Sequence, residues 1–405
     1  MKMYSNRSVS SFVAAIIVVC FYFAGIQADA KNTSNMNEIQ VSNVEELYAA
    51  VNDPQNTGVR ILLLPGVYAL SPLDALGQAR PNGGRLELQA DMSISGTRGH
   101  REAVVIEAVG LPAASFQGGP VPLAAIRTGR GRNAIEWLTV QNARFGQGNI
   151  VTTLDDGGSA QLRVAHIVST GSNNNLSIAN FGPSRAGKTM DVDVFDCDLV
   201  DSSIGLKQGF RIGNFSGSNG GVVNVKLIGN RIRGNQFSLI INNGTSGAAI
   251  NVFSLGNRYS ENGAGLLVVG GLNGASGSTI TYSGNGDHFE GNDAPPFADQ
   301  GGLFFVGGDR LAGGALGASN NTVNAVLVAN RLSDNAYADL VVLGGRSFQP
   351  EFISTVTANS VFLRMIGMPR RSGVVEIIGD SSPDDPATGN SARVCRGIFW
   401  PRCGS

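Results

Sequence analysis

Short apolar runs alternate with polar turn residues through the middle of the chain. Three stretches, beginning at Val225, Phe253 and Leu327, share one order: an apolar run, an Asn, four further residues, a second Asn, and an apolar run led by Leu. The runs have the length of strands and are bounded by Gly, Asn or Ser. No amphipathic stretch of helix length interrupts them, which disfavours a sheet with helical crossovers. The pattern predicts an all-β solenoid, a parallel β-helix in which successive coils pair their strands.

The first Asn of each unit recurs at a nearly constant distance from the Leu-led run. That distance is nine residues for Asn230 and Asn257, and ten for Asn330. Asn tolerates the left-handed backbone of a sharp turn, and stacked amides can bond to the coils above and below. We therefore expect one column of stacked Asn residues inside the coils, with Asn262 outside it. At periods of 27 to 45 residues, further members of the column are expected to be Asn142, Cys197 and Asn285.

A different pattern precedes these repeats. Asn43 and Glu46 match a capping box at a helix start. An apolar strand over residues 59–64 then leads into Pro65-Gly66-Val67-Tyr68. This order of helix, strand and Pro-Gly-x-Tyr resembles the opening of pectin-lyase-like right-handed parallel β-helix proteins. The resemblance covers residues 41–380 at the level of the fold, and it implies a capping α-helix that plugs the apolar end of the coils.

The first thirty residues predict an export signal. Lys2 and Arg7 supply positive charge, residues 12–26 form an apolar run, and Ala28-Asp29-Ala30 offers a cleavage site. The run is shorter than the roughly 20 residues that a membrane span requires. We expect a secreted, periplasmic or cell-surface protein whose mature chain begins at Lys31 and has no membrane span.

The cysteines suit an oxidising compartment. Residues 31–380 are predicted to form the β-helix with its cap, and residues 381–405 a C-terminal tail. Within the tail, Cys395 and Cys403 are expected to form a disulfide. Cys197 has acidic neighbours rather than basic ones, which predicts a buried and inert thiol.

Composition narrows the classes of partner. Charged residues make up 15% of the chain and the net charge is −1, which excludes a strongly basic nucleic-acid-binding protein and an acidic disordered chain. Residues 182–189 fit the phosphate-loop pattern, but phosphate binding requires a helix that begins at Lys188. Residues 190–195 instead alternate as a strand does. We therefore expect no nucleotide or nucleic-acid partner. We also expect a monomer.

Enzymes of pectin chemistry carry motifs that this chain mostly lacks. The family's polygalacturonases are marked by Asn-Thr-Asp, Asp-Asp, Gly-His-Gly and Arg-x-Lys, of which only Asp155-Asp156 is present. Its pectate lyases share Trp-x-Asp-His, and the nearest segment here is Glu136-Trp137-Leu138. The resemblance therefore implies an architecture without assigning one of these reactions.

His288 lies in the first cluster of candidate residues. Asp287 and Glu290 flank it, so a carboxylate could tune this imidazole as a general base, or several acids could bind calcium. An insertion follows, and insertions in solenoids map to loops that often carry the binding face. The candidates for substrate binding lie in and after it: Phe297, Asp299, Asp309 and Arg310. The alternative is a solvated polar turn.

A second cluster combines two acids with bases of neighbouring coils. Asp155 and Asp156 precede Lys188, Lys207 and Arg211. Lyases of the resembled family abstract a proton with a basic residue and neutralise the adjacent carboxylate with a metal or an arginine. We treat these residues as candidate catalytic groups, with ordinary turn charges as the alternative.

Two hypotheses about function follow. The first is a secreted protein that binds or processes extracellular polysaccharide, and as an enzyme it would be a polysaccharide lyase or a glycoside hydrolase. The second is a non-catalytic structural or adhesion protein of the cell surface. The step from a β-helix to polysaccharide is an analogy between folds. The missing motifs favour the second hypothesis, whereas the loop cluster around His288 supports the first.

Overall fold

The computed structural model describes most of the chain between residues 37 and 404. The described residues are 37–112, 124–143, 148–152, 154–202, 207–215, 217–292, 301–310, 317–335, 338–347, 356–367, 375–378, 389–396 and 402–404. The chain divides into two compact units, Met1–Glu38 and Ile39–Ser405. The predicted export signal lies outside the described residues, and the architecture below is that of the second unit.

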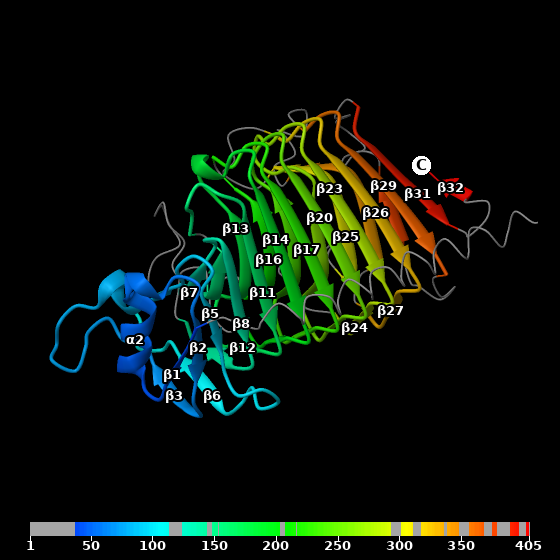
Figure 1. The fold of residues 1–405 in the computed structure, drawn as a ribbon. Helices are drawn as coiled ribbons and strands as arrows, with labels where there is room; N and C mark the ends of the chain where they lie inside the picture. The colour runs from blue at the N-terminus through cyan, green and yellow to red at the C-terminus, as the bar shows by residue number, and fades with distance from the viewer. Residues whose placement is uncertain are drawn as a thin grey trace, which may run out of the picture. The chain divides into compact units, whose positions relative to one another are not determined.

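Three parallel sheets wind around one core, as a right-handed parallel β-helix requires. In each complete coil the chain passes through sheet 1, then sheet 2, then sheet 3, and strands of successive coils lie side by side (Figure 1). The predicted fold is therefore confirmed.

Sheet 1 has 13 strands in the described residues. They are β1 (Glu38–Val41), β2 (Arg60–Leu63), β5 (Ser93–Ser95), β8 (Arg132–Glu136), β11 (Ala160–Ala165), β14 (Thr189–Phe195), β17 (Val222–Ile228), β20 (Ala249–Leu255), β23 (Thr279–Asn285), β26 (Thr322–Val328), β29 (Ser360–Ile366), β31 (Ser391–Arg396) and β32 (Arg402–Gly404). Only β32 runs antiparallel to its neighbour among the described pairs of this sheet.

Sheets 2 and 3 have nine and ten described strands. Sheet 2 contains β3 (Gly66–Ala69), β6 (Val104–Glu107), β9 (Thr139–Gln141), β12 (Val168–Thr170), β15 (Asp198–Val200), β18 (Arg231–Arg233), β21 (Arg258–Ser260), β24 (His288–Glu290) and β27 (Arg331–Ser333). Sheet 3 contains β4 (Leu86–Glu87), β7 (Ala124–Thr128), β10 (Gly148–Thr152), β13 (Asn174–Asn180), β16 (Gln208–Asn214), β19 (Phe237–Asn243), β22 (Ala264–Val269), β25 (Leu303–Arg310), β28 (Leu340–Ser347) and β30 (Val375–Ile378).

One helix, α2 (Val44–Asn52), covers the first strands. The Asn43 side chain accepts a hydrogen bond from the Glu46 amide at 2.9 Å, so the predicted cap is confirmed. The Glu46 carboxylate in turn accepts from the Ser42 amide at 2.7 Å. The helix buries its apolar face in the core through Leu47 and Val51, which are at most 1% exposed. The described residues also contain three short 3-10 helices: η2 (Pro54–Asn56), η3 (Pro81–Gly84) and η4 (Pro183–Arg185).

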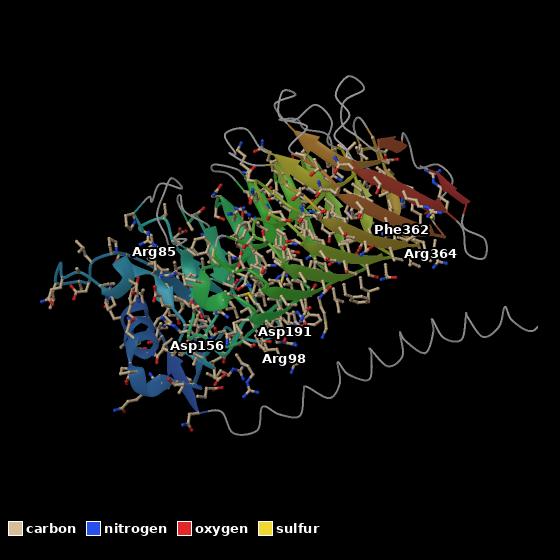
Figure 2. All side chains as sticks on the ribbon, turned by 90° about the horizontal axis from the view of Figure 1, so that it is seen from above. Arg85, Arg98, Asp156, Asp191, Phe362 and Arg364 are labelled. Atoms are coloured by element: carbon tan, nitrogen blue, oxygen red, sulfur yellow. The ribbon has the colours of Figure 1, made fainter. Side chains whose placement is uncertain are left out.

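Strand alternation separates the core from the outer surface. In β17, Val223, Val225 and Leu227 point inward and are at most 2% exposed, while the residues between them are more exposed. On the outer face of sheet 1, Asp191 of β14 lies toward one end and Phe362 and Arg364 of β29 toward the other (Figure 2). Each coil thus sends every second residue into a common apolar core.

Stacked amides occupy the corner between sheets 1 and 2, as predicted. The Asn230 amide group donates to Asn257 Oδ1 at 2.9 Å, and Asn230 Oδ1 accepts from the Cys197 backbone at 3.0 Å. Cys197 therefore belongs to this first ladder, and it is buried and free, as the sequence predicted. The ladder continues through Asp287 to Asn330.

The prediction that Asn285 and Asn142 belong to the column is wrong. Asp287, not Asn285, occupies the ladder, because the turn glycine is Gly286 with φ of +61° and the ladder residue follows it directly. Asn285 is instead the last residue of β23. Asn142 lies outside the ladder and donates to Glu107 Oε2 at 2.9 Å.

Asn262 is also misplaced in the prediction, because it is 1% exposed and belongs to a second ladder. Its amide group donates to Asn292 Oδ1 at 3.1 Å, and its Oδ1 accepts from Asn235. This second ladder lies between sheets 2 and 3, and a third lies between sheets 3 and 1, where Asn321 donates to Asn359 at 3.0 Å. A solenoid with three corners can thus hold a stacked column of amides at each of them.

The phosphate-loop pattern has the predicted strand context. Residues 183–185 form η4, and β14 begins at Thr189, directly after Lys188. The helix that a phosphate-binding loop requires is therefore replaced by a strand of sheet 1.

Candidate functional site

The outer face of sheet 3 carries polar side chains in the middle of the β-helix. In β16, Phe210 and Ile212 point into the core, so Arg211 between them points outward. Its register partners are Ser177 of β13 and Ile240 of β19. The three residues form an outward row that runs across adjacent coils.

Arg211 has an unusual environment for a guanidinium group. It lies over the Phe215 ring, with its central carbon 4.4 Å from the ring centroid. Its Nε is buried and has no hydrogen-bond partner, and no described carboxylate forms an ion pair with the side chain. Burial lowers the pKa of Arg211 to about 10, so the group remains a cation at neutral pH. The residue nevertheless keeps part of its surface accessible.

The polar neighbours of Arg211 also have unused hydrogen-bonding atoms. We call these residues, together with Arg211 and Phe215, the Arg211 patch. Atoms with neither solvent contact nor a hydrogen-bond partner occur in four of its members: Asn174 (Oδ1 and Nδ2), Ser177 (Oγ), Gln208 (Oε1) and Asn242 (Oδ1). A Cβ on Gly213 would lie 2.5 Å from the Phe215 ring and 2.7 Å from Asn242 Oδ1, so a glycine here allows the ring and the amide to converge. Native proteins leave few buried polar atoms unpaired, so their concentration on three adjacent strands marks a candidate binding site.

Three other arginines with little solvent exposure show how this chain pairs a guanidinium with a carboxylate. Arg346 pairs with Asp309 at 2.5 Å, and Arg185 pairs with Asp155 at 3.3 Å and also donates to backbone carbonyls. Arg127, in the same outward row as Arg211, pairs with Glu87. Arg211 has no such carboxylate partner among the described residues. The buried Arg85 lacks one too, but it donates to the Pro112 carbonyl at 3.1 Å, whereas Arg211 Nε has no hydrogen-bond partner.

Apolar surfaces flank the Arg211 patch on both sides. Toward the N-terminus, Val151 and Ala179 pack with Phe215. Toward the C-terminus, Ile240, Leu267 and Phe304 continue the outward row as part of a second buried cluster. The polar atoms around Arg211 are therefore enclosed between two apolar segments of the same sheet.

The structure does not assemble the predicted cluster of Asp155, Asp156, Lys207 and Arg211. Asp155 follows the end of β10, whereas Lys207 is an exposed residue directly before β16, so they lie at opposite edges of sheet 3. Asp155 accepts from the Ser184 hydroxyl and from the Gly157 amide at 2.7 Å. Burial alone would raise the pKa of Asp155, but these hydrogen bonds and Arg185 lower it overall. Asp156 is exposed in the same turn (Figure 2).

The predicted cluster around His288 is divided between the inside and the outside of the coil. His288 is exposed on sheet 2, where its register partners are Arg258 and Arg331. Glu290 lies two residues later and accepts from Arg258 at 3.2 Å. Asp287 is 0% exposed in the first ladder, where burial raises its pKa to about 6. The expectation that Asp287 tunes His288 is therefore wrong, because the two side chains point to opposite sides of the coil wall.

The remaining candidates have separate outcomes. Asp309 is 0% exposed and is held by Arg346, a partner that the sequence analysis did not identify. Only the backbone of Arg310 is described, in β25. Phe297 and Asp299 lie outside the described residues. Among the described residues no three His, Cys, Asp or Glu side chains come together as metal ligands.

Two further observations concern the predicted location and disulfide. In the part of the chain that the structure describes, no helix has the length and apolar character needed to cross a membrane. Cys395 and Cys403 are register partners in the antiparallel pair β31–β32, and Cα atoms of such partners are about 4.5–5.5 Å apart, within the range that a disulfide spans. The pairing remains a prediction, now with a backbone geometry that suits it.

Sequence reasoning identified Arg211 by its residue type and missed the residues around it. A signal was present, because in Gln208-Gly-Phe-Arg-Ile-Gly-Asn214 a cation alternates with two core residues of one strand. Asn174, Ser177 and Asn242 occupy strands that read as apolar or neutral, and their position beside Arg211 depends on the register between coils.

No protein-family model matches the chain, and no curated protein matches it. Among solved structures, the chain is similar to the periplasmic alginate epimerase AlgG, with 13% sequence identity, coverage of 89% of this chain and 85% of that chain, and a TM-score of 0.33. It is also similar to the A-module of the mannuronan C-5 epimerase AlgE4 of Azotobacter vinelandii, with 12% identity, coverage of 87% and 100%, and a TM-score of 0.34. At such low identity and TM-score the function has to be argued from this chain's own residues.

Proposed function

We propose that the protein is an exported binding protein for acidic polysaccharides, and that Arg211 receives a carboxylate of the polysaccharide. The observation that carries this proposal is the Arg211 patch, in which a cation without a protein anion lies among polar atoms without partners. Export is supported by the N-terminal sequence pattern.

The chemistry of the patch selects a carboxylated and hydroxyl-rich ligand. A guanidinium presents parallel N–H donors that match the two oxygens of a carboxylate. The amide and hydroxyl groups of Asn174, Ser177 and Asn242 can donate to and accept from sugar hydroxyls. A uronic acid unit provides both kinds of group on one ring, whereas a neutral sugar leaves the cation unpaired.

The solenoid geometry suits a polymer rather than a single sugar. Adjacent coils repeat at the strand spacing of about 4.8 Å, which is close to the length of one sugar ring in an extended chain. The outward row that contains Ser177, Arg211 and Ile240 continues across coils on both sides. An extended polysaccharide can therefore contact several coils while one of its carboxylates reaches Arg211.

We propose binding rather than catalysis as the principal function. The described members of the Arg211 patch include no carboxylate, imidazole or amine that could act as a base. This agrees with the absence of the polygalacturonase and pectate lyase motifs. The alternative of a polysaccharide lyase or glycoside hydrolase is tested by the same experiment, since each releases a characteristic product.

The test measures binding of a panel of polyuronates, alginate among them, and of a neutral glucan, by titration calorimetry at two salt concentrations. Replacing Arg211→Ala removes a charge-assisted contact worth roughly 1.5–3 kcal/mol, so affinity for the preferred polyuronate should fall about 10- to 100-fold. Arg211→Lys keeps the charge without the planar fork and should bind with intermediate affinity.

Arg231→Ala is the matched control, because it removes an exposed arginine of sheet 2 that pairs with Asp198. It should leave polyuronate affinity nearly unchanged. Equal affinities for the wild type and Arg211→Ala, or equal binding of the neutral glucan, would contradict the proposal. Products that absorb at 235 nm or new reducing ends would show that the protein is an enzyme.

A further inference from the structure

Three bulky residues occupy strained backbone positions at the corner between sheets 1 and 2. Trp137, His166 and Asp196 have φ of +57°, +56° and +45° in three successive coils. The next three coils place glycine there, at Gly229, Gly256 and Gly286. Asp and His adopt positive φ more readily than most residues, so Trp137 is the most strained of the three, and strained residues are often found at functional sites.

The three side chains form one continuous contact, which we call the corner stack. The Trp137 and His166 rings stack at 3.9 Å between centroids with 14° between planes. His166 Nδ1 lies 3.0 Å from Asp196 Oδ2. The His166 side chain is 30% exposed and that of Asp196 is 61% exposed, so both polar ends of the stack reach solvent.

Two arginines beside the corner stack are already paired with carboxylates. Arg101 donates to the backbone oxygen of Asp196 at 3.1 Å and to the Asp198 carboxylate at 2.6 Å. Arg163 pairs with Glu136 at 2.7 Å. These cations already have carboxylate partners, so the exposed Asp196 carboxylate and the aromatic pair are the groups left for a ligand.

We propose that the corner stack is a second glycan-binding site, which takes one sugar ring against the Trp137–His166 pair. The C–H face of a sugar packs on an aromatic surface, and its hydroxyls can donate to the Asp196 carboxylate. A negative charge at Asp196 disfavours a uronate, so the ligand class is a neutral sugar unit.

The corner stack and the Arg211 patch lie on different faces of the coil, one between sheets 1 and 2 and the other on sheet 3. A protein with both sites would link two polysaccharide chains. This linking rests on the proposed function of Arg211, whereas sugar binding at the corner stack does not.

Glycine substitutions test the corner stack without creating an unfavourable backbone, because later coils carry glycine at the same position. We expect His166→Gly and Asp196→Gly to fold and to melt close to the wild type, because glycine adopts positive φ without strain. The protein contains 2 Trp residues, so Trp400→Phe leaves Trp137 as the single fluorescent indole. In that background, neutral oligosaccharides should change Trp137 emission saturably, and Asp196→Gly should weaken binding about tenfold or more.

The outcomes distinguish the two sites. Loss of oligosaccharide binding in Asp196→Gly with a retained melting temperature supports the corner stack, whatever Arg211→Ala does to polyuronate binding. If both glycine variants melt lower and bind as the wild type does, the stack is structural and the proposal is overturned. An emission that no neutral oligosaccharide changes also overturns it. Light scattering with a polymer that contains neutral and acidic units should show cross-linking that either Asp196→Gly or Arg211→Ala abolishes.

Discussion

Asp287 is a carboxylic acid in a column built for amides, and replacing it with Asn should stabilise the protein at neutral pH. In the first ladder Asn230 and Asn257 each donate through Nδ2 to a backbone carbonyl of the preceding coil, that of Val194 and that of Leu227, both at 3.0 Å. A carboxylate has no hydrogen to donate there. Asp287 Oδ1 accepts from Asn257 at 2.8 and 3.0 Å, but Oδ2 is buried without a hydrogen-bond partner.

The magnitude follows from the pKa. Burial raises the pKa of Asp287 to about 6, and the hydrogen bonds from Asn257, together with the nearby Ser254 and Tyr282 hydroxyls, offset only part of the effect of burial. An Asp in the unfolded chain titrates near 3.9, so the difference is about two units, or about 3 kcal/mol. Because the folded state binds the proton more tightly, this stabilisation is complete below about pH 4. It declines as the pH rises and is lost once the pH exceeds the folded-state pKa of about 6.

The assay compares unfolding of the wild type and Asp287→Asn in urea between pH 4 and pH 8. An amide restores the missing donor at every pH, so we expect similar stability near pH 4 and an advantage of about 3 kcal/mol for the variant near pH 8. If unfolding is irreversible, apparent melting temperatures at one scan rate serve the same comparison. Asp191→Asn is the control, because it makes the same change of charge on the exposed face of sheet 1, where Asp191 accepts from Asn224.

Two results would refute the reasoning. One is an identical change in stability with pH for the wild type and Asp287→Asn. The other is a variant that is less stable than the wild type near pH 8, which would mean that the ladder needs the charge rather than the donor.

Three further predictions concern the ladders and the chain termini. Asn257→Leu and Asn262→Leu should both lower the melting temperature strongly, since each leaves buried backbone groups unpaired at about 1–3 kcal/mol apiece; a small effect for Asn262→Leu would contradict the second ladder. Cys395 and Cys403 should be linked in peptide maps of unreduced protein, with Cys197 reduced, and a link to Cys197 would show that the first ladder opens. N-terminal sequencing of exported protein should begin at Lys31, and recovery of Met1 would contradict the predicted cleavage.

The sequence was sufficient for the fold because the solenoid repeats in one dimension. Asn230 and Asn257 recur at a fixed spacing, and the segment that ends in Tyr68 marks the start of the coils, so both could be read without knowing any long-range contact. A single corner is enough to explain every recurring Asn of the sequence, so the sequence alone does not separate the second ladder from the first. Asn285 resembles the other ladder residues in type, but each ladder residue directly follows a turn residue of positive φ, such as Gly229, Gly286 or Ala329, and Asp287 is the residue in that position.

The candidate site was harder to predict because it depends on which edge of a sheet a residue reaches. Asp155 and Lys207 are separated by whole coils, and the lengths of the intervening turns place them at opposite edges of sheet 3. His288 and Asp287 are adjacent in sequence, yet strand alternation directs one outward and the other inward. A spacing in sequence gives the coil to which a residue belongs, and only the register gives its neighbours.

The spacing of about 4.8 Å between stacked strands also explains why an unpaired charge such as Arg211 indicates a binding partner from outside the chain. A solenoid places register partners side by side, so like charges in a row repel, while neutral amides can donate and accept along the column. On sheet 2, an outward row contains Arg231, Arg258 and His288. Carboxylates neutralise its positive charge, since Asp198 pairs with Arg231 and Glu290 pairs with Arg258. Arg211 has instead the neutral partners Ser177 and Ile240. Its charge therefore faces no opposing charge from the described rows of its own sheet, and an anion from outside the chain is the partner that the architecture leaves for it.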